Sequence, residues 1–257
     1  QGEEKDAVKR NVLVLLHEKY GICEEDLISA ELCAVPAYEA MDIGLDRSMI
    51  GAYGQDDRIC AYTAMMAEIQ AKAPEYTTVT ALVDKEEIGS VGATGMRSRF
   101  FENSLAEVMA LTGEYQELTL RRALKNSKML SSDVNAGFDP LYAASFDKKN
   151  ASYCGSGMVI SKYTGSRGKS GSNDANAEYL AQLRNIFDQN HAHYQTAELG
   201  KVDAGGGGTI AYIAALYGMN VIDCGVAVLS MHAPWEVTSK ADVYEAQKCY
   251  VAFLQNA

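Results

Sequence analysis

The sequence lacks several features that would place the protein at a membrane or on nucleic acid. It has no run of 18 apolar residues, the length that a helix needs to cross a bilayer, and no visible signal peptide. It also lacks positive charge, because its 257 residues carry a formal net charge of −11. Nucleic-acid binding depends on clustered Lys and Arg side chains. We therefore expect a cytoplasmic protein with neither a membrane nor a nucleic acid as its partner.

A disulfide framework is not expected either, because the six cysteines are scattered and form no CxxC pair. This distribution is typical of buried thiols in a reducing compartment. The apolar content of 47% is enough for a sizeable core, and 257 residues can hold one large α/β domain or two small ones. The first residue is Gln1 rather than Met, so we expect a fragment or a processed piece of a longer chain.

The spacing of apolar residues predicts alternating strands and helices. Strands are expected at residues 29–36, 77–83, 128–133, 157–162, 194–199 and 221–228. Helices are expected at residues 57–72, 102–126 (one helix or two), 173–190 (capped by Asn173 or Asp174), 209–217 and 239–255, whereas residues 8–17 fit a helix or a strand. The Gly- and Ser-rich residues 164–172 are typical of a mobile loop. The alternation favours a sheet covered by helices on its faces.

Two adjacent acids, Glu86 and Glu87, follow the apolar segment 77–83. In open α/β sheets, the carboxyl ends of the strands are where chemistry is done. Adjacent carboxylates repel each other unless one is protonated or a cation lies between them. A divalent metal would relieve this repulsion, with one glutamate binding the metal and its neighbour handling a proton of a water molecule. For an isolated pair, the alternative is ordinary solvated surface charge.

Further acids and one histidine recur at the boundaries of the predicted elements. Asp56 and Asp57 begin the helix at 57–72, Asp133 ends a strand, and His232 follows the last strand. Taken singly, each acid also fits a helix cap or a surface group, and His232 fits a core or loop position. Together, carboxylates and an imidazole suit zinc, cobalt or manganese, and carboxylates bridge the ions of two-metal aminopeptidases.

The motifs around these residues resemble those of the aspartyl aminopeptidase and vacuolar aminopeptidase I family of co-catalytic zinc metallopeptidases. They are Gly-Gln-Asp-Asp-Arg, Asp-Lys-Glu-Glu-Ile-Gly-Ser, Ser-Ser-Asp-Val-Asn-Ala and Ser-Met-His, and they occur in the same order. The resemblance covers roughly residues 28–257. The related tetrahedral aminopeptidases share Asp-Asp-Arg and Glu-Glu. They rank second because their next aspartate is expected fewer residues after the Glu-Glu pair.

The resemblance implies an α/β fold, a three-layer α/β/α sandwich of the zinc-aminopeptidase (phosphorylase/hydrolase-like) type with a remnant of an inserted β domain. Residues 1–36 would be the tail of that β-rich domain. Residues 37–257 would be the catalytic domain, incomplete at its N-terminus. The resemblance also implies hydrolysis of N-terminal residues from peptide substrates and assembly into a homo-oligomer, which in this family is often a tetrahedral dodecamer.

The resemblance implies roles for the motif residues. Asp56 would bridge two divalent ions, most readily zinc, with cobalt or manganese as alternatives. Glu87 and His232 would complete one metal site, and Asp133 would belong to the other. Glu86 would be the general base that takes a proton from the water between the metals and passes it to the leaving amine.

Around the metals, the predicted contributors are Asp57, Asp84, Gly207, Gly208 and Lys169. Asp57 would follow a cis peptide bond, and Asp84 would orient a ligand. The glycines, within Gly205–Gly208, would bound the pocket or donate N–H groups to the oxyanion, or simply form a tight turn. Lys169, with Arg167 and Lys201, would meet an acidic substrate side chain, or carry solvated loop charge. Trp235 would wall the pocket, or simply pack.

One departure from the family pattern concerns the second metal site. The family uses a histidine from an early His-x-Asp motif, and none of the histidines here is followed by Asp two residues on. Either a complementary N-terminal polypeptide supplies the missing part, or the chain is incomplete. Two alternatives stay open: a related deacylase or other amidohydrolase of the same architecture, and a non-catalytic half-subunit.

Overall fold

The computed structural model describes residues 5–167, 169–201, 203 and 206–257, and it divides the chain into two units, Gln1–Ala37 and Tyr38–Ala257. The described part of the first unit contains helix α1 (Ala7–Tyr20), which ends at Gly21 in the left-handed conformation, and the short 3₁₀ helix Glu25–Ile28. The ambiguous segment 8–17 is therefore helical. The strand predicted at 29–36 is wrong, because no described segment pairs with it and Leu32 is exposed. That this unit is the tail of an inserted domain stays a prediction.

The helices of the second unit follow the predicted pattern with shifted ends. They are α2 (Gln55–Gln70), α3 (Phe100–Leu111), α4 (Glu117–Asn126), α5 (Ala177–Gln189), α6 (Ala211–Ala215) and α7 (Lys240–Asn256). Short 3₁₀ helices lie at η2 (Glu86–Ile88) and η3 (Pro140–Ser145). Residues 102–126 form two helices, and the chain passes between them through Gly113 at φ 78°. Within the described residues, no helix has both the length and the apolar character that a bilayer crossing requires.

The cap of α5 is neither of the two predicted residues. The side chain of Asn176 accepts the hydrogen bond from the backbone N–H of Tyr179 at 2.7 Å. Asn173 and Asp174 belong instead to a strand, and the Asn173 side chain donates to the carbonyl oxygen of Val221 at 3.0 Å. The helix therefore begins later than its polar sequence suggested.

The strands form two larger sheets and a hairpin. One sheet has the order β3 (Lys128–Ser132), β9 (Asn220–Gly225), β5 (Met158–Ser161) and β8 (Tyr194–Thr196), with β9 antiparallel to β5 and the other pairs parallel. The other has the order β1 (Met41–Ile43), β2 (Met49–Ala52), β11 (Glu236–Ser239), β10 (Ala227–Leu229) and β4 (Asn135–Ala136). The hairpin joins β6 (Tyr163–Ser166) and β7 (Ser170–Asp174).

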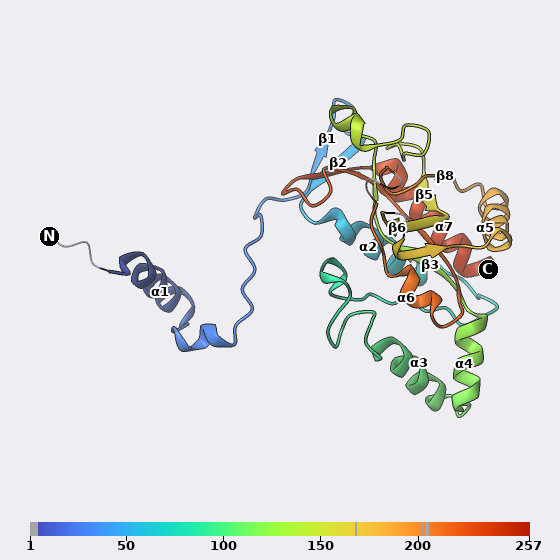
Figure 1. Ribbon diagram of the computed structural model, residues 1–257, viewed down its shortest axis with the longest axis horizontal. Coiled ribbons are helices and arrows are strands. Elements are labelled where there is room, and N and C mark those ends of the chain that lie inside the picture. Colours follow the sequence, from blue (N-terminus) through green and yellow to red (C-terminus); the bar gives the residue numbers. More distant parts are fainter. Residues whose placement is uncertain (1–4, 168, 202, 204–205) are drawn as a thin grey trace. The chain divides into compact units, whose positions relative to one another are not determined.

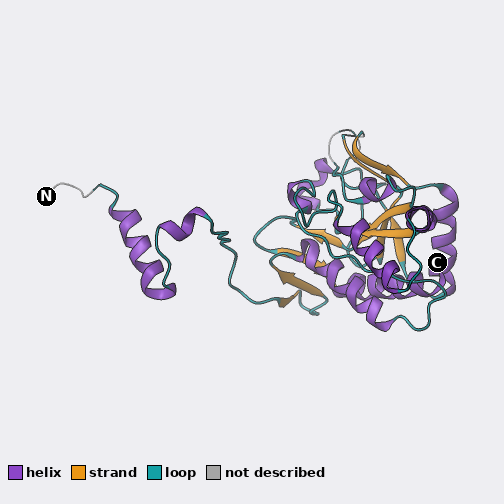
Figure 2. Ribbon diagram, turned by 90° about the horizontal axis from the view of Figure 1, so that it is seen from below, coloured by secondary structure: helices purple, strands orange, loops and turns teal. Residues whose placement is uncertain are grey.

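Helices cover both faces of the four-stranded sheet, and β9 is accordingly buried along almost its whole length. Ile222 and Cys224 lie in the main core with buried residues of α2, α5 and α7. Val221, which points the other way, packs in a second cluster with α6. Figures 1 and 2 show the strands of this unit lying between its helices. The predicted three-layer α/β/α architecture is thereby confirmed.

Three sequence predictions in this unit are wrong. Residues 77–83 form no strand, and Val79 is 53% exposed, because no described strand lies beside the segment to complete a ladder. Residues 164–166 and 170–172, expected to belong to a loop, lie in the strands β6 and β7. Residues 221–228 form two strands rather than one, because β9 and β10 pair in different sheets.

Candidate metal centre

Residues from distant parts of the second unit converge at one place. The Nε2 atom of His232 lies 2.8 Å from Oδ2 of Asp56 and 3.1 Å from Oε1 of Glu87. These three side chains offer ligand atoms that all lie within 4.8 Å of one another. A second group with the same spacing consists of Asp56, Asp57 and Asp133. Asp56 belongs to both groups, so it occupies the place between two candidate metal positions.

The start of α2 presents Asp56 to the site. Gly54 takes the left-handed conformation before the helix, and the peptide bond between Asp56 and Asp57 is cis, as expected. The buried Gln55 side chain donates hydrogen bonds to the carbonyl oxygens of Ile50 (3.1 Å) and Glu236 (2.8 Å). These bonds tie the first turn of α2 to β2 and β11.

Glu86, Glu87 and His232 lie where the chain turns sharply. The 3₁₀ helix that contains the two glutamates lies between Lys85 (φ 68°) and Gly89 (φ 87°), both left-handed. His232 is itself left-handed, with φ 65°, and its side chain is 59% exposed. Left-handed backbone is sparsely populated by residues other than glycine. Such positions commonly mark functional sites.

Asp57 and Asp133 form the buried end of the site. The backbone N–H of Asp133 donates to the carbonyl oxygen of Cys224 at 2.9 Å, which fixes the end of β3 against β9. One carboxylate oxygen of Asp133 accepts from the N–H of Val134 at 2.8 Å. The buried Oδ1 of Asp57 has no hydrogen-bond partner in the part of the chain that the structure describes. A buried unpartnered carboxylate oxygen beside other acids fits a cation-binding site.

Burial, and after it the nearness of other acids, raises the pKa values of the acids in this site. Burial, followed by the charge of Glu87, raises the pKa of Asp56 to about 6. Burial is also the main cause that raises the pKa of Asp57 to about 8 and that of Asp133 well above its usual value. The pKa of Glu86 is raised as well, by burial and then by Glu87 and Asp56. A divalent cation would neutralise this cluster of acids. The carboxylate oxygens and the His232 nitrogen are donors that suit zinc.

Sequence reasoning missed one residue beside the cluster. Glu236 is 1% exposed, and its carboxylate accepts the backbone N–H groups of Asp56 at 3.1 Å and His232 at 2.8 Å. Its signal in the sequence is weak: an acid that opens the run Glu-Val-Thr-Ser, four residues after the candidate histidine.

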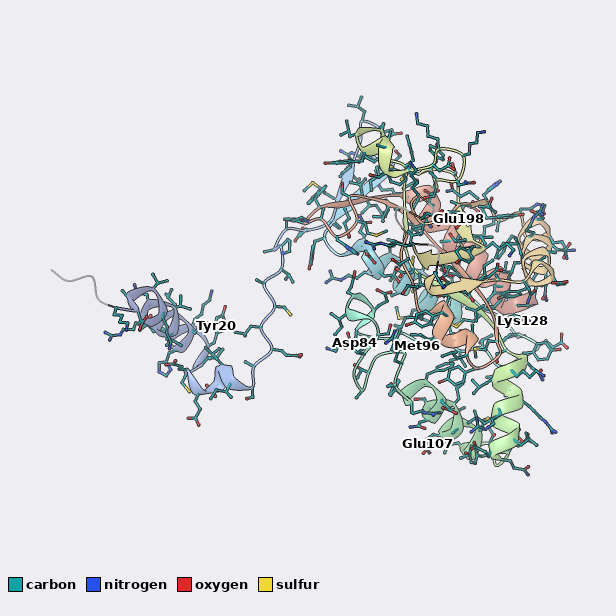
Figure 3. All side chains as sticks on the ribbon, in the orientation of Figure 1. Tyr20, Asp84, Met96, Glu107, Lys128 and Glu198 are labelled. Carbon is teal, nitrogen blue, oxygen red and sulfur yellow. The ribbon has the colours of Figure 1, made fainter. Side chains whose placement is uncertain are left out.

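Two other predicted contributors, Asp84 and Lys169, are not part of either candidate ligand group. Asp84 (labelled in Figure 3) is exposed, and its carboxylate accepts from the Thr94 hydroxyl at 3.1 Å and lies 3.5 Å from Nζ of Lys85. No ion pair or hydrogen bond joins it to a ligand candidate among the described residues. Lys169 lies in the turn of the β6–β7 hairpin, where its N–H donates to Ser166 at 3.2 Å. Their predicted roles stay predictions.

The glycine-rich segment packs against that hairpin. An added Cβ at Gly208 would lie 3.0 Å from the carbonyl oxygen of Gly171, and one at Gly207 would lie 3.2 Å from Leu199. Gly205 lies outside the described residues. Trp235 packs against Tyr38 in a tilted arrangement, with ring centroids 4.6 Å apart and 50° between the ring planes.

The chain matches known proteins over nearly its whole length. The model of the family described as aminopeptidase I zinc metalloprotease (M18) matches residues 1–254. The probable M18 family aminopeptidase 1 of Clostridium acetobutylicum is 62% identical over 255 residues, which are 99% of this chain and 55% of that protein. The chain thus spans about half the length of the curated relatives it matches.

Solved structures agree with this match. The crystal structure of aminopeptidase I from Clostridium acetobutylicum is similar with a TM-score of 0.90 and 61% identity, covering 99% of this chain and 55% of that one. A structure described as the mApe1 dodecamer of S. cerevisiae has a TM-score of 0.69 at 22% identity, covering 95% of this chain and 54% of that one. The second likeness shows the fold alone.

Proposed function

Because the chain belongs to the aminopeptidase I zinc metalloprotease family (M18), we propose that it forms the metal-binding part of an aminopeptidase that hydrolyses N-terminal residues from peptides. The observation that carries the proposal is the convergence of Asp56, Glu87 and His232, whose ligand atoms lie within 4.8 Å of one another. The chain spans about half of its relatives, so the activity of the whole protein is part of the proposal.

Two divalent ions fit the donor groups of the site. Asp56, Glu87 and His232 would hold one ion, and Asp56 with Asp133 would hold the other. Zinc is the first expectation, with cobalt or manganese as alternatives, because the first group offers carboxylate oxygens and an imidazole, the second group offers carboxylate oxygens, and neither contains a thiol. The unpartnered Oδ1 of Asp57 supports a cation at the second position. When bound, such ions polarise a carbonyl oxygen and lower the pKa of a water molecule.

The residues of this chain would perform the proton transfers and orient the ligands. Glu86 is half-buried beside Glu87, and burial raises its pKa, which makes its carboxylate a stronger proton acceptor than an exposed glutamate. We assign Glu86 the role of the general base, which accepts a proton from the attacking water and delivers it to the leaving amine. Asp56, fixed through the start of α2, would keep the two metal positions at a constant separation.

Hydrolysis of free aminoacyl amides tests the proposal, compared with N-acylated amides under metal-replete and chelator-treated conditions. We expect metal-dependent cleavage of the free amides only. Cleavage of the N-acylated series instead would favour the deacylase. Metal binding without any turnover would favour a non-catalytic half-subunit that needs a complementary polypeptide.

Glu86→Gln, with Glu107→Gln as its control, separates the roles within the site. Glu107 is an exposed glutamate of α3, labelled in Figure 3, so its replacement should leave turnover unchanged. Glu86→Gln should retain the metal and lose most of the turnover, and a near wild-type rate would refute the assignment.

The assembly and location of the protein belong to the same proposal. We propose a homo-oligomer in the cytoplasm, with the tetrahedral dodecamer as the specific form. The supporting observation is a dodecameric S. cerevisiae protein of the same fold. The mass of the purified protein in solution, determined by light scattering, distinguishes this assembly from a monomer.

A further inference from the structure

The carboxylate of Glu236 lies between the two chain segments that present the metal ligands. One oxygen, Oε2, accepts the backbone N–H of Asp56 at 3.1 Å, and the other, Oε1, accepts the backbone N–H of His232 at 2.8 Å. The side chain is fully buried, with 1% exposure, and it is not itself part of either candidate ligand group. Among the described residues, the hydrogen bonds of the Glu236 carboxylate to the candidate ligands go to their backbone N–H groups.

Strand pairing and hydrogen bonds hold the residue that carries this carboxylate. Glu236 is the first residue of β11, where it pairs with Ala52 of β2. Its carbonyl oxygen accepts from the Gln55 side chain, which also accepts a hydrogen bond from the hydroxyl of Thr238 on the same strand at 2.5 Å. The carboxylate is therefore held on a paired strand that is also bound to the start of α2.

The two segments that Glu236 connects need such a connection. Asp56 follows a left-handed glycine at the start of α2, and His232 lies in a turn with a left-handed backbone of its own. Left-handed conformations of non-glycine residues persist where the surrounding structure holds them. The buried Glu236 carboxylate holds the His232 turn through the hydrogen bond to the His232 N–H, in addition to the bond from the Ala233 N–H to the Ser230 carbonyl oxygen at 2.9 Å.

We propose that Glu236 is a positioning residue that sets the separation between the Asp56 carboxylate and the His232 imidazole before the metal binds. This inference rests on the proposed metal site. Residues that orient metal ligands without binding the metal usually form hydrogen bonds with the ligand side chain. Here Glu236 acts on the backbone of the ligands, so one buried acid fixes two ligands that are far apart in the sequence.

The chemistry of the two hydrogen bonds explains why a carboxylate is required. An ionised carboxylate accepts through both oxygens, whereas the amide of glutamine accepts through one and donates through its nitrogen. Glu236→Gln keeps the shape of the side chain but places a donor against one of the two backbone N–H groups. Glu236→Asp keeps both acceptor oxygens but is one methylene shorter. It should therefore retain one of the two hydrogen bonds and part of the wild-type zinc affinity.

Zinc affinity, measured by competition with a chromophoric chelator, tests the inference on the full 257-residue chain. The matched control is Asp242→Asn, because Asp242 is also fully buried and also accepts two backbone N–H groups, those of Gly155 and Gly157, both at 2.7 Å. We expect Glu236→Gln to weaken zinc binding about 10–100-fold, as loss of an orienting partner typically does. Glu236→Asp should fall between Glu236→Gln and wild type.

The control distinguishes positioning from general stability. Asp242→Asn should lower the denaturation midpoint yet keep the wild-type zinc affinity. Equal zinc affinity in wild type and Glu236→Gln would overturn the inference while leaving the proposed function intact. Absence of zinc binding by the wild type would refute the metal site, and the inference with it.

Amide hydrogen exchange in the metal-free wild type gives a readout that requires no variant, should Glu236→Gln fail to fold. The N–H groups of Asp56 and His232 should be protected before any metal is added, although the His232 side chain is exposed. Exchange of both groups at the rate of an open loop would overturn the inference.

Discussion

Gly225→Ala is the substitution for which the structure gives the sharpest expectation about the second metal position. A Cβ added at Gly225, the last residue of β9, would lie 1.7 Å from the backbone carbonyl oxygen of Asp133 and 3.1 Å from the sulfur of Cys60. Cβ contacts closer than 3.0 Å essentially do not occur. The carbonyl oxygen of Asp133 must therefore move by about 1.3 Å, the difference between this 3.0 Å limit and the 1.7 Å contact.

The magnitude follows from what opposes that movement. The backbone N–H of Asp133 donates to Cys224 and that of Asn135 donates to Val226, each at 2.9 Å, so the two segments are fixed to each other on both sides of the clash. Overpacking costs about 1–3 kcal/mol, and each backbone hydrogen bond that is stretched or broken contributes about 0.5–1.5 kcal/mol. We expect Gly225→Ala to lower the free energy of unfolding by about 3 kcal/mol.

Urea unfolding of the metal-free protein measures this loss, and zinc titration measures its consequence for the site. Gly137→Ala is the control, because a Cβ there would approach Leu229 and the carbonyl oxygen of Val228 no closer than 3.2 Å. We expect the control to change stability little and to keep both metal affinities. Gly225→Ala should weaken the metal position of Asp133. Unchanged stability and unchanged metal binding in Gly225→Ala would refute the close approach of β9 to Asp133.

Three further predictions concern the acids. Glu86→Gln should keep the metal content and lose about 10²–10⁴-fold in turnover, the usual contribution of general acid–base catalysis, as measured with aminoacyl amides. In the metal-free chain, the raised pKa values of Asp56 (about 6) and Asp57 (about 8) mean that the folded state holds protons that the unfolded state has released above its carboxyl pKa of about 3.9. The free energy of unfolding should therefore fall as the pH rises from about 4 to 8, and greater stability at pH 8 than at pH 5 in chelator would contradict this. Metal analysis of the isolated chain should find the His232 position filled and the Asp133 position weak, because two carboxylates bind a transition metal less tightly than a set with imidazole; two tightly held ions with full activity would count against it.

The convergence of the candidate ligands could be predicted from the sequence because four motifs with acids and a histidine resemble those of one family in the same order. Asp56, Glu87 and His232 are far apart in the sequence, and their motifs alone indicated a common site, which the structure assembles. Glu236 could not be predicted in this way, since its carboxylate binds backbone N–H groups. Backbone partners leave no pattern in the sequence.

The errors in the fold have a related cause. The apolar residues of 77–83 report a preference for burial, but a strand also needs a neighbour to complete its ladder, and no described segment supplies one. The Gly- and Ser-rich segment 164–172 carries little local preference for a strand. Its hairpin is held by distant contacts, among them the hydrogen bond from Thr164 to the buried Asp223 at 2.6 Å.

Anomalous diffraction at the zinc absorption edge, from crystals of the chain grown with zinc, tests the proposed metal site most directly. We predict a strong peak about 2.0–2.2 Å from a carboxylate oxygen of Asp56, a carboxylate oxygen of Glu87 and the Nε2 atom of His232. Absence of a peak between these three side chains, or zinc bound to a cysteine sulfur instead, would contradict the proposed site.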